Sequence, residues 1–370
     1  MKNKLLIPWA KPDIGIEEFK QVQSSFKSNW LTQGPKVKEF EKKMANFCNS
    51  KYGIAVSNGT SALDIAYKTL KIKEGDEVIL PALSYFSTAS MITYQKAIPV
   101  FVDIKQNNFN LDPQKIQQAI SKRTKAIAFI DYGGNPSQLN EILNIGKKYN
   151  IKVLQDGAQS LGALYKGKPM GANTPISTMS FHMAKILSTV EGGMIFTNNK
   201  KFKNEIVMRR SHGEKKPGDY KHNILGYNAR MTDLQAGIGL AQLDKLNFFV
   251  KKRQEVAKLY DSLFKNCKNI ILPETNKNCK NAYFFYPILL KNRDRIAKRL
   301  KKIYGIDTRV AYRYPLYKQN LYKSKKARFV KKNCPVAEKI SSRILNLPIY
   351  PSLKNKEVQY IFNSIYKEMK

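Results

Sequence analysis

The chain has 370 residues, 42% of them hydrophobic, and its 65 Lys and Arg against 28 Asp and Glu give a net charge of +37. This length suits two domains or one large one, and no apolar run approaches the roughly 20 residues of a membrane span, so we predict no membrane partner. The basic residues are spread along the whole chain, mostly as pairs such as Lys42-Lys43, and form no basic arm. We therefore predict a solvated basic surface and no nucleic-acid partner.

The cysteines and histidines form no metal-ligand pattern. The four cysteines are scattered, and the three histidines lie far from any zinc-like spacing. The cysteines are Cys48, Cys267, Cys279 and Cys334. They also lack the density of a disulfide scaffold, so we predict a reduced, cytoplasmic protein without a structural metal.

Two amphipathic helices are predicted at the start of the chain, over residues 15–28 and 35–48. Pro35 suits the first position of the second helix, and residues 30–35 form a polar turn between the two. In both helices the apolar residues recur at helical spacing. The two stripes are Ile16, Phe19, Val22 and Phe26, then Val37, Phe40, Met44 and Phe47.

Strands and helices alternate after the second helix. Apolar runs that read as strands are each followed by a helical pattern, over residues 54–57, 77–80, 99–104, 125–130 and 151–154. Repeated units of this kind predict an α/β protein with a mostly parallel sheet covered by helices on both faces. Ligands of such sheets gather at the carboxyl ends of the strands, where Gly59-Thr60, Tyr85 and Asp156 fall.

The stretch from residue 151 to 197 carries the groups that pyridoxal phosphate (PLP) requires. Asp156 closes one strand, Ser180 lies in a second apolar run, and Lys185 follows it before a strand at 194–196. PLP needs a lysine for the Schiff base, an anion against the pyridine nitrogen and donors around its phosphate. These three residues raise a PLP site as a hypothesis, beside the alternative that Lys185 is one more solvated lysine.

The remainder of the chain predicts a smaller α+β domain. A helical pattern from residue 232 to 263 is followed by a strand at 282–290, a helix at 293–304 and a terminal helix after Ser352. We place the boundary within the long helix near Asn247, giving domains at 1–246 and 247–370. Gly237-Ile238-Gly239 lies inside the helical pattern and does not follow a strand, which argues against a dinucleotide site.

Five motifs together resemble the DegT-type nucleotide-sugar aminotransferases. They are SNGTSALDIAY (57–67), PALSYFSTASMI (81–92), QDGAQS (155–160), SFHMAKILSTVEGGMI (180–195) and GYNARMTDLQAGIGLAQL (226–243). The likeness runs from WLTQGPKVKEFE (30–41) to LNLPIYPSL (345–353). It implies a PLP enzyme of fold type I, in which an aspartate aminotransferase-like large domain with a mostly parallel sheet carries a smaller C-terminal α+β domain.

The resemblance also implies roles for individual residues around the cofactor. Lys185 matches the Schiff-base lysine, Asp156 the partner of the pyridine nitrogen, and Gln159 the residue that bonds the ring hydroxyl. Tyr85 matches the aromatic residue stacked on the ring. The phosphate cradle corresponds to Gly59, Thr60 and Ser180. The alternatives are that Thr60 is a helix cap, Gln159 a polar helix residue and Tyr85 part of the core.

Other matches concern the partner subunit and the substrate. Asn228 matches a residue that reaches the phosphate from the neighbouring subunit, which implies a homodimer with shared active sites; its alternative is a helix cap. Trp9, Thr32 and Gln33 match positions that line the sugar-nucleotide site. The chain departs from the family at four positions. Gln155 and Gly157 stand for the usual Glu and Ala, Val190 for a frequent Gly, and Ala311 for a frequent His.

We therefore predict a transaminase that moves an amino group, from L-glutamate by resemblance, to a keto sugar linked to a nucleoside diphosphate, for amino-sugar and surface polysaccharide biosynthesis. One alternative is a PLP-dependent sugar dehydratase, but those enzymes replace the lysine by His, and Lys185 is present. Others are an aminotransferase of a cyclitol-like ketone and a non-catalytic regulator that keeps the PLP fold.

Overall fold

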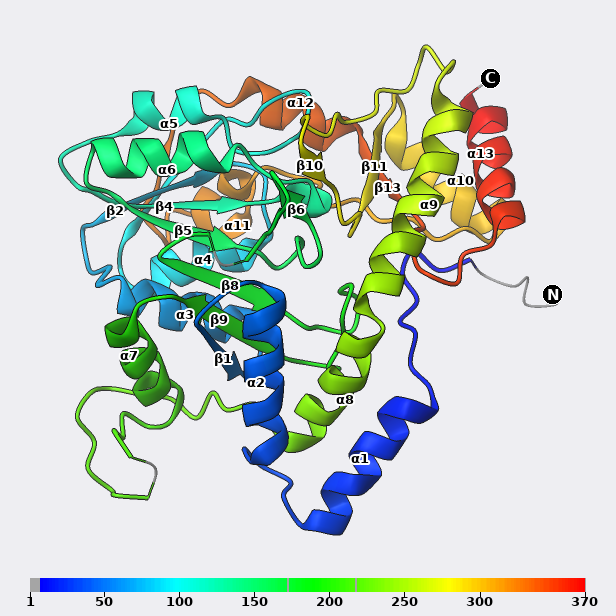
Figure 1. Cartoon of the computed structure of the whole chain (residues 1–370). Helices are drawn as coiled ribbons and strands as arrows, with labels where there is room; N and C mark the ends of the chain where they lie inside the picture. Colours follow the sequence, from blue (N-terminus) through cyan, green and yellow to red (C-terminus); the bar gives the residue numbers. More distant parts are fainter. Residues whose placement is uncertain (1–6, 172, 217, 370) are drawn as a thin grey trace.

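A computed structural model describes residues 7–171, 173–216 and 218–369 (Figure 1). Both predicted N-terminal helices are present, as α1 (Ile16–Ser28) and α2 (Pro35–Phe47). The start of α2 is capped from far along the chain, because the Asp233 carboxylate accepts hydrogen bonds from the backbone N–H groups of Gly34, Lys36 and Val37 at 2.8 to 3.1 Å. A carboxylate at the start of a helix also interacts favourably with the helix dipole.

The two helices bury different faces. In α2 the apolar stripe is buried, as a core-facing helix requires. In α1 the predicted stripe faces outward, and Phe19 is 61% exposed while Glu18 and Ser25 are buried. Glu18 lies against α8 (Asp233–Asp244), where it accepts a hydrogen bond from Gln242 at 2.7 Å. The apolar face of α1 therefore has no covering element within the described part of the chain.

The large sheet confirms the predicted architecture. All of its strands run in one direction except β9, which is antiparallel to both neighbours. In spatial order the strands are β1 (Tyr52–Val56), β9 (Gly193–Thr197), β8 (Ile176–Ser180), β5 (Lys152–Asp156), β4 (Thr124–Ile130), β2 (Glu77–Pro81), β3 (Ile98–Val102) and β12 (Val330–Lys331). Since β1, β2, β5 and β8 share a direction, the loops that follow them meet at one edge of the sheet.

Helices cover both faces of this sheet. Figure 1 shows α5 and α6 on one side and α3 and α7 on the other. The bounds are α3 (Gly59–Thr69), α4 (Phe86–Tyr94), α5 (Pro113–Ala119), α6 (Leu139–Lys148) and α7 (Lys200–Arg210). A short 3₁₀ turn, η1 (Tyr132–Gly134), follows β4, and β6 (Leu164–Tyr165), β7 (Lys168–Pro169) and β10 (Cys279–Lys280) form a small separate sheet.

A second hydrophobic core lies in the C-terminal part. The predicted long helix is broken at Lys245 into α8 and α9 (Leu246–Phe264). This core also uses β11 (Tyr286–Leu289), α10 (Arg293–Tyr304), β13 (Ile344–Leu347) and α13 (Asn355–Met369). The predicted strand at 282–290 is too long, because the backbone of residues 282–285 bonds to Gly133 and Gly134 and not to a neighbouring strand. Its antiparallel partner β13 was not predicted.

The segment between the two parts of this second core returns to the large sheet. Its elements are η2 (Leu316–Lys318), α11 (Asn320–Lys323), β12 and α12 (Pro335–Arg343), and β12 pairs with β3. The buried apolar residues between Ala311 and Ile344 belong to the first core, while Ile7 belongs to the second. The boundary at 246/247 therefore stays a prediction. Within the described residues, no helix combines the length and apolar character needed to cross a membrane.

Candidate active site

A buried carboxylate stands at the carboxyl end of β5. Asp156 is 5% exposed, and its Oδ2 accepts a hydrogen bond of 2.7 Å from the Thr88 hydroxyl while Oδ1 accepts one of 3.2 Å from the Ala158 N–H. Burial raises the pKa of Asp156, and these donors and the charge of Lys185 act against that rise. A protonated ring nitrogen beside Asp156 would stabilise its charged form in this buried place.

Lys185 lies in the loop that follows β8 and is half-buried. Its Nζ lies 4.4 Å from the centre of the Phe284 ring. Burial lowers the pKa of Lys185 to about 8, although the nearby Asp156 charge opposes the shift. A substantial share of this amine is therefore neutral near physiological pH, as a nucleophile and a proton acceptor require. This environment sets Lys185 apart from the solvated lysines of the surface.

The pKa of Lys185 predicts how covalent capture of PLP depends on pH. Only the neutral amine attacks a carbonyl, and its fraction rises with pH through about 8, whereas an ordinary lysine titrates near 10.4. Capture by cofactor-free protein, followed by absorbance, should therefore speed up from pH 7 and level off above about 9. Asp156→Asn should move the midpoint to lower pH, because it removes the charge that favours the ammonium. A rate that still climbs steeply at pH 10 would contradict this prediction.

The start of α3 forms an anion-binding corner with the end of β8. A Cβ added to Gly59 would lie 2.8 Å from the Ser180 Cβ, so this close approach requires glycine. Asn58 caps the helix by accepting the Ser61 N–H at 2.8 Å, so the alternative role of Thr60 as the cap is wrong. The N–H groups of Gly59 and Thr60 have no acceptor in the described part of the chain. They are free to bind a phosphate.

Gln159 and Tyr85 both lie close to Tyr312. The Gln159 side chain accepts the Gly133 N–H at 2.7 Å and donates to the Tyr312 hydroxyl at 3.0 Å. Gln159 lies in a turn and not in a helix, so its alternative role is wrong. Tyr85 is 61% exposed before α4, which rules out the core-packing alternative, and its ring centre lies 6.3 Å from that of Tyr312.

Tyr312 is a site residue that the sequence analysis missed. It lies 153 positions from Gln159 and directly follows Ala311, the residue that stands for the family's frequent His. The Ala311 carbonyl accepts hydrogen bonds from the Tyr132 hydroxyl and from the Asn346 side chain. These two donors fix the turn that carries Tyr312 into the site.

Asn228 is exposed and lies at the surface near the start of α3. It lines a depression of about 500 Å³ together with Thr60, Tyr94 and Tyr227. Its alternative role as the cap of α8 is wrong, because Thr232 caps that helix and accepts the Gln235 N–H at 3.2 Å. The reach of Asn228 into a neighbouring subunit stays a prediction.

The three predicted substrate residues lie in two places. Trp9 is half-buried, with its ring 6.0 Å from that of Phe285 and 5.2 Å from the Arg309 guanidinium. Phe285 in turn lies 4.2 Å, centre to centre, from Phe284 under Lys185. The Thr32 carbonyl accepts the backbone N–H at the start of α8 at 2.8 Å. Gln33 is half-buried in the same turn. Their contact with a substrate stays a prediction.

The Gln155 departure has a physical reason. The side-chain amide of Gln155 donates to the Asp131 carboxylate at 2.6 Å, and both residues are buried. The family's Glu at this position would place two buried carboxylates in contact, which is costly unless one is protonated. A neutral Gln155 therefore suits the buried Asp131, because its amide can donate to this carboxylate.

Val190 occupies a left-handed backbone conformation in the loop between Lys185 and β9. Its φ is +69°, a region that strains β-branched residues by about 1–2 kcal/mol. Val190 is also 52% exposed, so it contributes little packing. We expect Val190→Gly to raise stability by about 1 kcal/mol, or about 2 °C in Tm, and Val190→Ala to give less, because Ala keeps the Cβ. Thermal unfolding that shows Val190→Gly below the parent would contradict this.

The residues at this edge of the sheet fit PLP. A lysine of lowered pKa, a buried carboxylate and free N–H groups at a helix start lie at the ends of β8, β5 and β1, as a PLP-dependent enzyme of the α/β type requires. Residues 12–366 match the DegT/DnrJ/EryC1/StrS aminotransferase family, and the chain belongs to this family. It is therefore a PLP-dependent aminotransferase.

Relatives and solved structures are similar to this protein over nearly the whole chain. The GDP-perosamine synthase of Escherichia coli O157:H7 is 34% identical over 97% of each chain. The UDP-2-acetamido-2-deoxy-3-oxo-D-glucuronate aminotransferase of Pseudomonas aeruginosa is 36% identical over 89% of each. The structure of Helicobacter pylori PseC, an aminotransferase of pseudoaminic acid biosynthesis, has a TM-score of 0.92 at 30% identity, covering 98% of this chain and 99% of that one. The predicted family and fold are confirmed.

Proposed function

We propose that this enzyme transfers an amino group from L-glutamate to a keto sugar linked to a nucleoside diphosphate, in amino-sugar and polysaccharide biosynthesis. The observation that carries the proposal is the half-buried Lys185, with a pKa of about 8, in the field of the buried Asp156. The related enzymes named above act on GDP- and UDP-linked sugars, which supports the substrate class but leaves the nucleotide open.

Each residue of the site has a defined task in this reaction. PLP, when bound, supplies an electron sink for the carbon that gains or loses the amino group. Asp156 would keep the proton on the pyridine nitrogen of PLP, and Gln159 would orient the ring by bonding to the ring hydroxyl. The N–H groups of Gly59 and Thr60 hold the phosphate. Lys185 would hold PLP through its Nζ, and the same amine, with its lowered pKa, would serve as the group that accepts and returns a proton at the substrate carbon.

We further propose that the enzyme is a homodimer with shared sites. The outward apolar stripe of α1, with Ile16 and Phe19 each 61% exposed, is a surface that a second copy would cover. Tyr94 is 74% exposed and lines the same depression as Thr60 and Asn228, so apolar surface adjoins the phosphate end of the site. We place the enzyme in the cytoplasm, because its scattered cysteines suit a reducing compartment.

The alternatives differ in chemistry. The presence of Lys185 argues against a sugar dehydratase, and Lys185 with Asp156 argues against a non-catalytic regulator. Ala311, in place of His, keeps open a non-nucleotide ketone such as a cyclitol.

Absorbance of the purified protein tests the proposal. Adding L-glutamate should abolish the band of the Lys185-bound cofactor, and a GDP- or UDP-linked keto sugar should then restore it. A cyclitol ketone that restores it, where no nucleotide sugar does, would select that alternative. A yellow protein unmoved by any amino donor would favour the regulator.

A further inference from the structure

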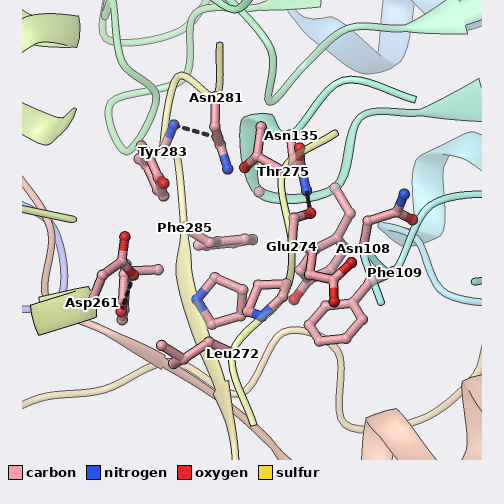
Figure 2. A pocket seen from close by; sticks show the side chains of 15 residues that line it. Asn108, Phe109, Asn135, Asp261, Leu272, Glu274, Thr275, Asn281, Tyr283 and Phe285 are labelled. Carbon is pink, nitrogen blue, oxygen red and sulfur yellow. Dashed lines mark hydrogen bonds between the residues drawn. The ribbon is translucent and has the colours of Figure 1, made fainter. Parts of the chain in front are cut away.

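A cavity of about 350 Å³ lies behind the cofactor site, where the C-terminal segment 272–287 passes the turns after β3 and β4 (Figure 2). Two residues that line this cavity, Gly133 and Phe285, also contact residues next to the cofactor site. The Gly133 backbone lines the cavity and donates its N–H to Gln159 at 2.7 Å. Phe285 also lines it and lies 4.2 Å, centre to centre, from Phe284, which in turn faces Lys185. A molecule in this cavity would touch groups one contact away from both Gln159 and Lys185.

Aromatic residues form the inner wall of the cavity. Figure 2 shows the Phe285 ring in the middle of the lining, between Tyr283 and Phe109. Phe109 and Tyr283 have φ of +63° and +52°, a backbone region that costs free energy in residues other than glycine. Aromatic faces of this kind suit the C–H faces of a sugar ring or an ammonium group.

The polar groups of the cavity favour a hydroxylated and positively charged ligand. The exposed Thr275 and the half-buried Tyr283 line the cavity, and their hydroxyl groups can bond to the hydroxyl groups of a ligand. Two carboxylates, of Asp261 and Glu274, stand at the exposed mouth. The described lining contains no Lys or Arg, although the chain has 65 of them. A phosphate would therefore meet no cationic side chain in the described lining and would be repelled by the two carboxylates.

We propose that this cavity is a second small-molecule site, which binds a hydroxylated primary amine without phosphate, the chemistry of a free amino sugar. The carboxylates of Asp261 and Glu274 attract the ammonium, and the ring lies on Phe285. Occupancy reaches the cofactor through the Gly133 bond to Gln159 and through the Phe285–Phe284 contact. The site holds no reacting group and is separate from the substrate site of the proposed function.

The test uses the holoenzyme after borohydride reduction, which fixes the cofactor on Lys185 and prevents any amine from reacting with it. D-glucosamine is titrated by calorimetry to about 10 mM, beside D-glucose and glucosamine 6-phosphate. We expect glucosamine to bind at least tenfold more tightly than either. The double variant Asp261→Asn, Glu274→Gln should weaken glucosamine at least tenfold and leave glucose unchanged, while Glu39→Gln, an exposed carboxylate on α2, should change neither. Glucosamine binding should also alter the fluorescence of the reduced cofactor.

Four outcomes would overturn the proposal. They are no heat with glucosamine, equal binding of glucose, tighter binding of the phosphate ester, and full binding in the double variant. A second variant keeps the location testable should the double variant fail to fold. Thr275→Trp changes an exposed lining residue and fills the cavity, so it must abolish binding while the transaminase half-reaction with L-glutamate continues. Unchanged cofactor fluorescence at saturation would overturn the coupling to the cofactor site.

Discussion

A Lys185→Ala variant is expected to fold and dimerise as the parent does, but to lose turnover by at least about 10³-fold. The side chain contributes little to stability, because its Nζ contacts the Phe284 ring and has no hydrogen-bond acceptor among the described residues. Two functions should disappear with it, since in the proposed mechanism the same amine holds the cofactor and moves the proton. Removal of both leaves only substrate positioning.

Reduction with borohydride and peptide mapping measures this directly. In the parent, the reduced cofactor should be found on the peptide that contains Lys185, and in the variant no peptide should carry it. Lys166→Ala is the matched control, because Lys166 also lies over an aromatic ring, that of Tyr165, but away from Asp156. Cofactor recovered on any other lysine would refute the assignment of Lys185.

The sequence predicted the sheet well because its strands are buried apolar runs separated by helices. Strand β5 (Lys152–Asp156), for example, contains the buried apolar residues Val153 and Leu154, which made the strand visible in the sequence, although the predicted range of 151–154 ended two residues early. The orientation of α1 was not predictable in this way. Its apolar stripe is real, but Glu18 has a partner on α8 that lies more than 220 positions away, and this pair turns the stripe outward.

The site residues differ in the same way: some were predictable from the local sequence, and others depend on contacts with distant parts of the chain. Lys185 and Asp156 were predictable because Asp156 ends one strand, Lys185 lies in the loop after another, and PLP chemistry needs both residue types. The requirement for Gly59 comes from its approach to Ser180, and no local pattern reports such a contact. Tyr312 was missed for the same reason, since a turn held by distant donors delivers it to Gln159.

The position of Asn228 leaves two arrangements open, and a heterodimer separates them. In the single chain Asn228 lies beside Thr60, at the surface depression near the start of α3. If the partner's cofactor phosphate comes to this surface in the homodimer, Asn228 serves the partner's site. If Asn228 instead bonds the cofactor phosphate of its own chain, each site obtains this contact from its own subunit. The Asn228→Ala homodimer should be nearly inactive. If activity remains, Asn228→Asp replaces it, because the added negative charge repels the cofactor phosphate.

A subunit carrying Asn228→Ala is paired with one carrying Lys185→Ala, and the mixed dimer is isolated through two different affinity tags. If Asn228 acts across the interface, both defects fall in one site and the other site is intact, so activity should return to about half of the parent per dimer. If Asn228 serves its own chain, each site carries one defect and the mixed dimer stays inactive. Asn223→Ala, an exposed asparagine in the same segment, replaces Asn228→Ala in the control dimer and should leave one working site in either arrangement. An inactive mixed dimer beside an active control would therefore refute the cross-subunit role, because assembly, tags and the Lys185→Ala subunit are common to both.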